Sequence, residues 1–558
     1  MAEKCITLNI NKCKNCHRCL MYCPVKAIRY SSGQAQIIDD ECILCGLCYN
    51  HCPQDAKVVQ DGATIVKRWI AEGEKVVASI APSYIAAFNG AGIFEMKSAL
   101  CKLGFYDVVE TAEAATAVTK EYERIMTEEK QDVIISTCCH SVNLLVQKYY
   151  PDLIKNLAHT KSPMQVSCQR IKETIPDAKT VFIGPCIAKI DEAKTYEGIV
   201  DAVITFEDII NWFAGENIVV DNSNRDMGGK TRLYPIPGGI LKTFSKDYPD
   251  YTYFAVDGVK KCKAVLEELS SGNIHNCFIE MSACTGSCIG GPILRKYHHT
   301  PILDRISVER SASKEDYDFA QPEKDALSKE FSWLQKSAHQ PSSREIQQIL
   351  NDMGKKKPAD ELNCGSCGYA TCRDKAVAVY QGKAEITMCL PYLKNRAEDI
   401  SSMLFNNSPN GILLINDDFV ITAINKSALE IFGDPSPSAM IGKSIIYYMD
   451  AQPFMQLITT GTRPEPQRVY LSDYNRYVEQ RFVYDKNYHQ IMLILIDVTK
   501  DETQKRQHEK LVSRTLTLAE EVSKKQMKTV QEIALLLGET AAETKIAITH
   551  LQESIKDE

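Results

Sequence analysis

Residues 280–292 read Glu280-Met281-Ser282-Ala283-Cys284-Thr285-Gly286-Ser287-Cys288-Ile289-Gly290-Gly291-Pro292. Two cysteines four residues apart, among glycines and small side chains, can place two thiolates on one metal cluster. The glycines let main-chain N–H groups approach cluster sulfur or a bound anion closely. Alone, the pattern is weak, because two cysteines in a tight turn can simply be buried. Its meaning depends on whether other cysteine loops meet it.

The composition of the chain favours metal binding over disulfides. It has 558 residues, a net charge of −7 and 22 cysteines. The length predicts several domains, and the charge gives no basic footprint for nucleic acid. No apolar run approaches the roughly 20 residues of a membrane span, and no signal peptide opens the chain, so we expect a cytoplasmic protein outside the membrane. Without a secretion signal, clustered cysteines indicate metal ligands.

Residues 1–65 contain one cysteine pattern twice, C-x2-C-x2-C-x3-C-P, beginning at Cys13 and again at Cys42. This repeat resembles the bacterial two-cluster ferredoxins, in which the fourth cysteine of each run binds the other cluster. The resemblance implies two electron-transferring 4Fe-4S clusters. One would be held by Cys13, Cys16, Cys19 and Cys52, and the other by Cys42, Cys45, Cys48 and Cys23. A zinc-binding module is the alternative, although it would not need both runs.

Residues 70–337 are predicted to form an α/β domain. The expected strands are Lys75–Ile80, Asp132–Ser136, Thr180–Gly184 and Ala202–Thr205, and the expected helices include Ile93–Lys102, Ala112–Thr127 and Ser141–Tyr149. Cysteine-bearing loops follow three apolar strands, at Cys138-Cys139, at Cys186 and in the opening stretch. Ligands of open α/β sheets bind at the carboxyl ends of the strands, so we expect these cysteines to share one crevice.

Taken together, the three loops resemble the signature loops of the iron-only hydrogenases. They are the adjacent cysteines of 136–140, the P-C-x-x-K-x-x-E of 185–192 and the E-x-x-A-C-x-G-x-C-x-x-G of 280–291. The resemblance implies a 4Fe-4S cluster on Cys139, Cys186, Cys284 and Cys288. Cys288 would also bridge to a di-iron unit that carries carbonyl, cyanide and a bridging dithiolate amine, which completes the H-cluster.

The same resemblance implies three catalytic residues. Cys138 would pass protons to the bridging amine. Lys189 would donate to a cyanide, for which an ammonium group is a suitable partner. Ser83, within Ala81-Pro82-Ser83, would donate to the other cyanide. Hydrogenase maturation proteins would have to build and insert the di-iron unit.

The chain departs from the family around the expected di-iron unit. Two methionines of the family are replaced by Gly184 and Ser282, and a proline and a tryptophan after the paired cysteines by His140 and Val142. A methionine-packing position made small and polar suggests a site retuned for sensing.

Departures also affect the proton relay of the family. Its serine corresponds to Ala158, which has no hydroxyl, and its glutamates correspond to Glu121 or Glu123. Because proton transfer needs an unbroken set of donors and acceptors, this predicts slow turnover or a different route, through His140 or Glu192.

A third cysteine set follows a predicted linker at residues 338–360. Residues 361–395 contain Cys364, Cys367, Cys372 and Cys389, and they resemble a small iron–sulfur domain of electron-transfer and corrinoid proteins. The resemblance implies a third accessory 4Fe-4S cluster. A zinc knuckle remains the alternative, because both metals accept four thiolates.

Residues 397–500 contain no cysteine. Strands are expected at 410–416, 419–424 and 490–496, with a short helix at 425–432. The order of these elements, with N-G-I-L-L-I-N and A-I-N-K-S-A-L-E-I-F-G, resembles a PAS domain. No residue commits the domain to haem, flavin or any other ligand.

The tail, residues 501–558, is predicted to be helical. Its apolar positions are Leu511, Leu516, Leu518, Val522, Val530, Ile533 and Leu537. We expect Gly538 to end one helix and Thr540-x-x-Glu543 to cap a second. A dimeric coiled coil is expected, and the alternative is one amphipathic helix that packs on the PAS domain.

The sequence therefore predicts a multidomain α/β and α+β protein: a two-cluster ferredoxin domain, an iron-only hydrogenase domain, a small 4Fe-4S domain, a PAS domain and C-terminal helices. The expected function is that of a slow, sensory iron-only hydrogenase, an enzyme that splits H2 reversibly into protons and electrons and signals through the PAS domain to a kinase or phosphatase. One alternative is a metabolic hydrogenase linked to ferredoxin or another redox partner. The other is a non-catalytic iron–sulfur protein of the same family.

Overall fold

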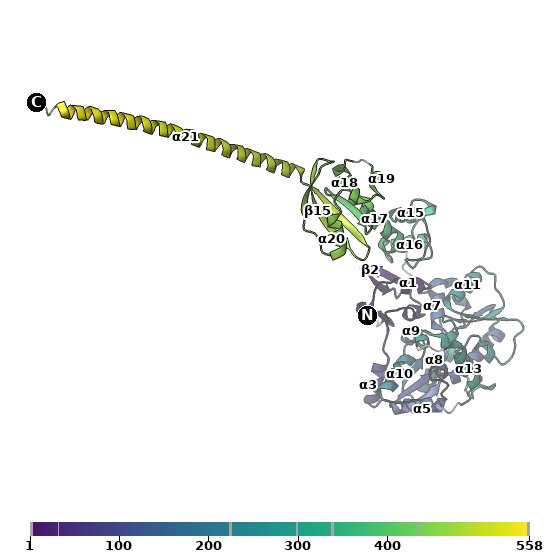
Figure 1. The fold of residues 1–558 in the computed structure, drawn as a ribbon. Coiled ribbons are helices and arrows are strands. Elements are labelled where there is room, and N and C mark those ends of the chain that lie inside the picture. The colour runs from purple at the N-terminus through teal and green to yellow at the C-terminus, as the bar shows by residue number, and fades with distance from the viewer. Residues whose placement is uncertain are drawn as a thin grey trace. The chain divides into compact units, whose positions relative to one another are not determined.

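The computed structural model describes residues 4–31, 33–222, 226–296, 300–335, 340–433 and 436–554. The chain divides into two compact units, Met1–Leu393 and Lys394–Glu558 (Figure 1). Among the described residues, no helix combines the length and the apolar character needed to cross a membrane.

The first 60 residues of unit 1 form two small antiparallel ladders around the cysteine runs. Strand β1 (Ile6–Leu8) pairs with β4 (Lys57–Val59), and β2 (Ile28–Ser31) pairs with β3 (Gln34–Ile37). The third cysteine of each run lies in a short helix, α1 (Arg18–Tyr22) or α2 (Leu47–Asn50). The two cysteine runs therefore fold in the same way.

The α/β region contains two parallel sheets. The first has the order β6-β5-β8-β9 and the second β10-β11-β7. Their strands are β5 (Val76–Ile80), β6 (Asp107–Glu110), β7 (Val133–Ile135), β8 (Lys179–Gly184), β9 (Ala202–Thr205), β10 (Thr252–Asp257) and β11 (Cys277–Ser282). The four predicted strands are confirmed to within a residue at each end. The sequence analysis expected one open sheet, but the strands form two sheets, because β7 pairs with β11 and not with β8.

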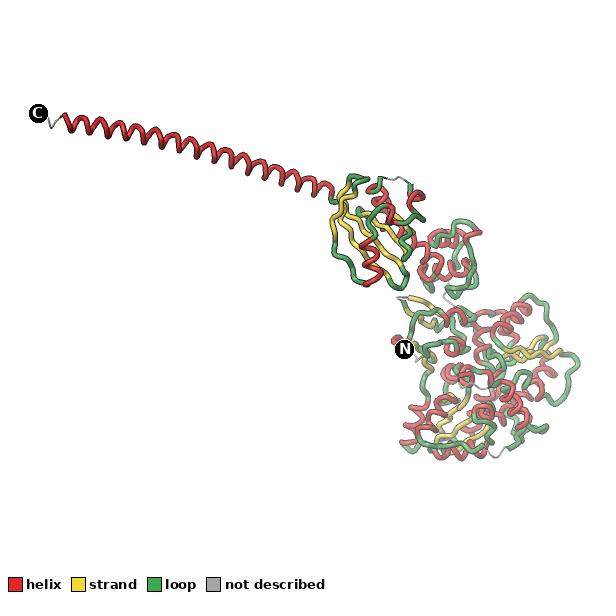
Figure 2. Tube along the Cα trace, viewed as in Figure 1, coloured by secondary structure: helices red, strands yellow, loops and turns green. Residues whose placement is uncertain are grey.

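Helices connect successive strands, as expected for parallel sheets, and three more helices follow the last strand (Figure 2). They are α3 (Ala63–Ala71), α4 (Tyr84–Ala87), α5 (Ile93–Lys102), α6 (Thr111–Arg124), α7 (His140–Tyr149), α8 (Pro163–Thr174), α9 (Ala188–Thr195), α10 (Phe206–Gly215), α11 (Val259–Ser270), α12 (Pro292–Lys296), α13 (Pro301–Ser311) and α14 (Lys324–Leu327). The three predicted helices are confirmed, and the chain after α6 continues as a wider π-type turn, Ile125–Glu129.

Alternate residues of the second sheet enter two different cores. Ile135 and Ile279 pack with α7 and α11, whereas Ile134 and Phe278 pack with α6 and α8. Strands covered on both faces explain why these segments are almost wholly apolar in sequence.

Residues 340–393 contain α15 (Ser343–Asp352) and α16 (Cys372–Tyr380), which pack on each other, and α16 with its neighbouring loops packs on the ferredoxin-like segment. One hydrophobic core contains Leu20, Ile28 and Tyr30 together with Tyr369 and Ala378. The main chain of Tyr30 donates to the carbonyl of Lys383 at 2.8 Å. These contacts make the third cysteine set part of unit 1.

Unit 2 begins within α17 (Leu390–Asn406) and contains one antiparallel sheet of order β13-β12-β16-β15-β14 (Figure 2). The strands are β12 (Gly411–Asn416), β13 (Ile421–Ile424), β14 (Gln467–Leu471), β15 (Arg476–Asp485) and β16 (Gln490–Asp497), and the helices are α18 (Lys426–Ile431), α19 (Pro437–Met440) and α20 (Gln452–Thr460). The predicted strands and the helix at 425–432 are confirmed.

The tail forms a single helix, α21 (Thr499–Ser554), visible as the long yellow ribbon of Figure 1. The predicted break at Gly538 is wrong. A glycine inside a helix costs only about 1 kcal/mol relative to alanine, and the helix formers on both sides offset this cost.

Candidate active site

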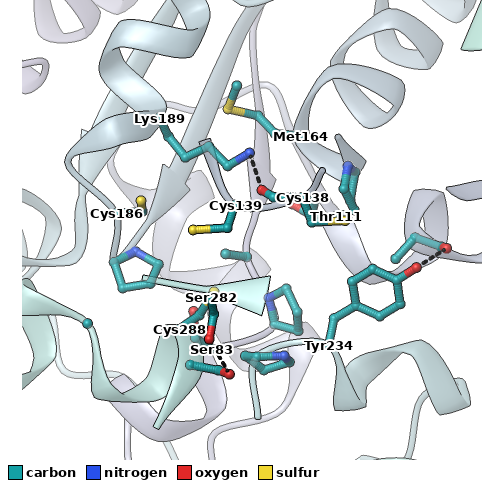
Figure 3. Close-up of a pocket in the computed structure, with 18 of the residues that line it drawn as sticks. Ser83, Thr111, Cys138, Cys139, Met164, Cys186, Lys189, Tyr234, Ser282 and Cys288 are labelled. Atoms are coloured by element: carbon teal, nitrogen blue, oxygen red, sulfur yellow. Dashed lines mark hydrogen bonds between the residues drawn. The ribbon is translucent and has the colours of Figure 1, made fainter. Parts of the chain in front are cut away.

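A cavity of about 130 Å³ lies where the two parallel sheets present the carboxyl ends of their strands. Five cysteines line it: Cys138, Cys139, Cys186, Cys284 and Cys288. Ser83 follows β5, Cys186 follows β8, Cys138 and Cys139 follow β7, and Ser282 ends β11. Figure 3 shows the side chains of Cys138, Cys139, Cys186, Cys288, Ser83 and Lys189 around this space. The structure thus brings together the three loops that the sequence singled out.

Two helices begin directly at the cysteine loops. Cys139 is the residue before α7, and α9 begins two residues after Cys186. The N-terminal turn of a helix leaves main-chain N–H groups free and carries a partial positive charge. Both features favour negative charge on the neighbouring sulfur atoms.

The adjacent thiols Cys138 and Cys139 have different partners. The main-chain N–H of Ala283 points to Cys139 Sγ at 3.5 Å. Cys138 Sγ lies 3.2 Å from the hydroxyl of Tyr122. Burial raises the pKa of the Cys138 thiol to about 12. Cys138 is therefore a protonated thiol at neutral pH.

Lys189 belongs to a buried network of charges. Its ammonium group donates to the carbonyl of Cys138 at 3.1 Å and pairs with Glu192. Lys329 pairs with the other oxygen of Glu192 at 2.6 Å. Burial disfavours the charge on Glu192, but the two ammonium groups outweigh it and hold the pKa of this carboxyl well below its usual range. Glu192 thus remains ionised and is a poor proton carrier.

Several polar atoms at the cavity are suited to a bound group. Ser83 Oγ is buried and has no hydrogen-bond partner among the described residues. The Ser282 hydroxyl lies 2.9 Å from that of Ser287, beside the turn that carries Cys284 and Cys288. An orphaned donor is costly in an empty apolar pocket, so a ligand with acceptor atoms fits this position. The donors and thiolates present are those that an iron–sulfur cluster with anionic ligands requires.

Glu280, on β11, binds the main chain of the segment Gly238–Leu241. Its carboxylate accepts main-chain N–H groups of Gly238, Ile240 and Leu241 at 2.9, 2.9 and 3.3 Å. Burial raises its pKa to about 7, although these N–H groups oppose the shift. The segment Gly238–Leu241 is thereby tied to β11 close to the cavity.

None of the residues predicted for the proton relay makes a hydrogen bond to Cys138 in the part of the chain that the structure describes. Arg124 holds both oxygens of Glu121, at 2.7 and 2.9 Å. Glu123 accepts from the main chain of Ser245. Ala158 is buried among apolar side chains, and the nearest hydroxyl to the thiol comes from Tyr122. Sequence reasoning missed Tyr122, although the helical spacing of Ala115, Val118 and Tyr122 could have placed it on the inner face of α6.

Among the described residues, His140 makes no hydrogen bond to the thiol. Its Nε2 faces Asp191 at 2.9 Å, and its Nδ1 is buried without a partner among the described residues. Lys329 was likewise missed by the sequence analysis. It lies 137 residues from Glu192 along the chain, and no local motif marks it.

The structure arranges the other predicted ligands in three sets of four. Separate small cavities are lined by Cys13, Cys16, Cys19 and Cys52, by Cys23, Cys42, Cys45 and Cys48, and by Cys364, Cys367, Cys372 and Cys389. These groupings match the exchange of the fourth cysteine between runs. Among the described residues, no three His, Cys, Asp or Glu side chains converge closely enough to hold a single metal ion.

The second of these sets lies next to the main cavity. Gly46, between Cys45 and Leu47, has a φ of +71°, and a Cβ there would lie 2.5 Å from Pro292 Cγ. Only glycine allows this approach between the Cys45 loop and the end of the Cys288 loop. A cluster at this set would therefore be the neighbour of one in the main cavity.

The third set lies against the first two. Lys26, close to Cys23, donates to the carbonyl of Gly368 at 2.8 Å, next to Cys367. Lys383 pairs with the buried Glu41 at 2.7 Å. Gly368 has a φ of +89°, and a Cβ there would lie 3.1 Å from Leu20. Three accessory sites and the main cavity thus follow one another within unit 1.

Four segments of the chain match models of protein families. Residues 74–251 and 242–292 match the iron only hydrogenase large subunit, C-terminal domain. Residues 12–56 match a 4Fe-4S dicluster domain, 360–391 a putative Fe-S cluster domain and 400–459 a PAS domain.

Three curated relatives are hydrogenases. The chain is 26% identical over 382 residues to the NADP-reducing hydrogenase subunit HndD of Solidesulfovibrio fructosivorans, covering 53% of this chain and 65% of that one. It is 26% identical to the periplasmic [Fe] hydrogenase large subunit of Nitratidesulfovibrio vulgaris, covering 50% and 84%. Iron hydrogenase 1 of Clostridium pasteurianum is 24% identical, covering 52% and 64%. The chain thus spans just under two thirds of the length of the first and third.

Among solved structures, the [FeFe]-hydrogenase HydA1 of Chlamydomonas reinhardtii aligns with a TM-score of 0.40 and 16% identity, over 50% of this chain and all of that one. Residues 74–292 are thus similar in sequence to the iron-only hydrogenases, and this is the segment that carries the cysteine loops of the cavity.

Proposed function

We propose that this protein is a sensory iron-only hydrogenase that splits H2 slowly and passes the resulting redox change to a signalling partner. The observation that carries the proposal is the single cavity in which Cys138, Cys139, Cys186, Cys284 and Cys288 meet Lys189. PAS and helical segments within the same chain support a role in signalling.

Cys139, Cys186, Cys284 and Cys288 would hold the H-cluster, with Cys288 as the bridge to its di-iron unit. That group supplies an open iron site for H2 and an amine that takes up a proton. Lys189, fixed by Glu192, would donate to one cyanide, and the unpartnered Ser83 hydroxyl to another. Cys138 would hold a proton at Sγ and exchange it with the amine. The apolar lining excludes bulk water.

Electrons would leave through the accessory sites. The loop of Cys45 touches the end of the main cavity's Cys288 loop through Gly46 and Pro292. The cysteine set of 364–389 packs on the ferredoxin-like segment, as described above. Three 4Fe-4S clusters in these sets would form a relay that ends at the small domain preceding the PAS domain. Ferredoxin or another redox partner could exchange electrons with the same relay.

A signalling partner, such as a kinase or phosphatase, would interpret the redox state through the PAS domain and α21. Within α21, apolar or small residues recur at alternating spacings of three and four. They are Met527, Val530, Ala534, Leu537, Ala541, Thr544, Ile548 and Leu551. This is the heptad pattern of a coiled coil, and the stripe supports a homodimer of this chain.

The proposal is tested by hydrogen–deuterium exchange between D2 and water in anaerobic protein loaded by maturation proteins. We expect slow but measurable exchange that is lost in Cys138→Ala, while the iron–sulfur absorption remains. Exchange as fast as in metabolic hydrogenases would favour the metabolic alternative. Complete absence of exchange in correctly loaded protein would favour the non-catalytic alternative.

A further inference from the structure

The thiol of Cys138 is held by Tyr122. The hydroxyl of Tyr122 lies 3.2 Å from Cys138 Sγ and accepts the main-chain N–H of Thr137 at 3.1 Å. The tyrosine is wholly buried, and its ring packs against Phe278 at 5.2 Å. Its position follows from α6, where Tyr122 stands between the buried Glu121 and the half-buried Glu123.

The direction of the bond follows from the number of protons available. A phenol has one proton to donate and oxygen lone pairs to accept with. Since Thr137 N–H already donates to the oxygen, the phenol proton needs an acceptor. Among the described residues, Cys138 Sγ is the only acceptor within reach. The phenol therefore donates to the sulfur, and the thiol proton is left on the opposite side of Sγ, which faces the cavity.

On the side of the thiol away from the cavity, the chain of hydrogen bonds stops at Tyr122. Its ring is enclosed by apolar side chains, among them Val118, Ile134 and Ala158. Arg124 and the main chain of Ser245 occupy the neighbouring carboxylates Glu121 and Glu123. A proton accepted by the phenol would have no onward acceptor in this cluster.

We propose that Tyr122 is a positioning residue that donates to Cys138 Sγ, directs the thiol proton into the cavity and closes the route behind it. The bond itself does not depend on the proposed function. Its consequence for proton exchange does, because that exchange requires a loaded site. The same contact accounts for slow turnover, since protons must reach Cys138 from the cavity side.

The bond is tested in protein without clusters by the infrared S–H stretch of Cys138, isolated as the difference between wild type and Cys138→Ala. We expect this band to shift in Tyr122→Phe, which removes the hydroxyl and keeps the ring. The matched control is Tyr253→Phe in the same core; among the described residues, the hydroxyl of Tyr253 bonds only to the main chain of Tyr248. An unchanged band in Tyr122→Phe overturns the proposal.

The role is tested in loaded protein by D2–water exchange as a function of pH. Loss of one orienting hydrogen bond, worth about 1 kcal/mol, should slow exchange less than about tenfold and leave the pH profile unchanged. A loss of about a hundredfold or more, as for removal of an acid–base group, together with a changed pH profile, would show that Tyr122 passes protons and would overturn the positioning role. If loaded protein shows no exchange at all, the proposed function fails while the infrared result still decides the bond.

Discussion

At the scale of single residues, the stability of the site depends most on the buried charges around Glu192. One carboxylate without exposed surface faces two ammonium groups, Lys189 and Lys329. Breaking a buried ion pair by removing one partner costs far more than an exposed pair is worth, because the remaining charge stays buried. The stability of unit 1 should therefore depend on Glu192 more than on either lysine.

Glu192→Gln is expected to destabilise unit 1 by about 3–5 kcal/mol, because two buried ammonium groups lose their carboxylate. Lys329→Met is expected to cost less, because the pair between Lys189 and Glu192 remains. Urea unfolding of full-length variants without clusters measures both. If Lys329→Met destabilises unit 1 as much as Glu192→Gln, Glu192 is not the carboxylate that compensates both ammonium groups.

Glu280 gives a pH dependence of known sign. Its pKa rises from an ordinary value of 4.5 to about 7 in the folded protein, so between these values the folded state binds more protons than the unfolded state. The contribution of Glu280 to the free energy of unfolding is fully present below the unfolded pKa. It is lost as pH rises through about 7, and the loss is at most ~3 kcal/mol.

This loss is measured as the difference in pH dependence of unfolding between wild type and Glu280→Gln over pH 4.5 to 7. The variant should lack the decline that wild type shows across this window. Equal slopes for the two proteins would mean that Glu280 titrates at its ordinary pKa.

At the scale of elements, the sequence predicted four strands of the α/β region, because buried parallel strands are nearly pure apolar runs. It could not predict that β7 pairs with β11 and β8 with β5, since pairing between distant strands leaves no local pattern. Tyr122 and Lys329 were missed for a similar reason: each contributes one side chain through a long-range contact. The continuous α21 shows that one glycine weakens a helix without ending it.

The packing of the small iron–sulfur domain depends on Gly368. A Cβ at Gly368 would meet Leu20 at 3.1 Å, whereas one at Gly382, also at positive φ, would meet nothing within 4 Å. Both alanine variants strain the backbone, but only Gly368→Ala disturbs the contact with the ferredoxin-like segment.

We therefore expect faster amide hydrogen exchange over residues 361–393 and at Leu20 in Gly368→Ala than in Gly382→Ala. Mass spectrometry of the full chain measures this difference. Identical exchange in the two variants would show that the contact does not hold the domain in place.

At the scale of the whole molecule, the chain joins a domain similar to the iron-only hydrogenases to a PAS domain and a long C-terminal helix. The PAS sheet buries its own core of residues such as Phe454 and Phe482, and α21 exposes its apolar residues along its length. A second copy of the chain would cover the stripe from Met527 to Leu551.

Dimer formation is tested with a matched pair on α21. Leu537 lies on the stripe and Leu535 beside it, and both are exposed, at 64% and 67%. Leu537→Glu should yield monomers by light scattering, whereas Leu535→Glu should remain dimeric. Equal masses for the two variants would exclude this stripe as the interface.

The central claim is that the cavity between the two sheets holds the H-cluster. Infrared spectroscopy of anaerobic protein loaded by maturation proteins tests it most directly, because carbonyl and cyanide ligands on iron absorb where the polypeptide does not. Bands of both ligands are expected in wild type, and the cyanide bands should shift in Ser83→Ala, which removes the unpartnered hydroxyl. Absence of both sets of bands from protein that contains its 4Fe-4S clusters would contradict the account.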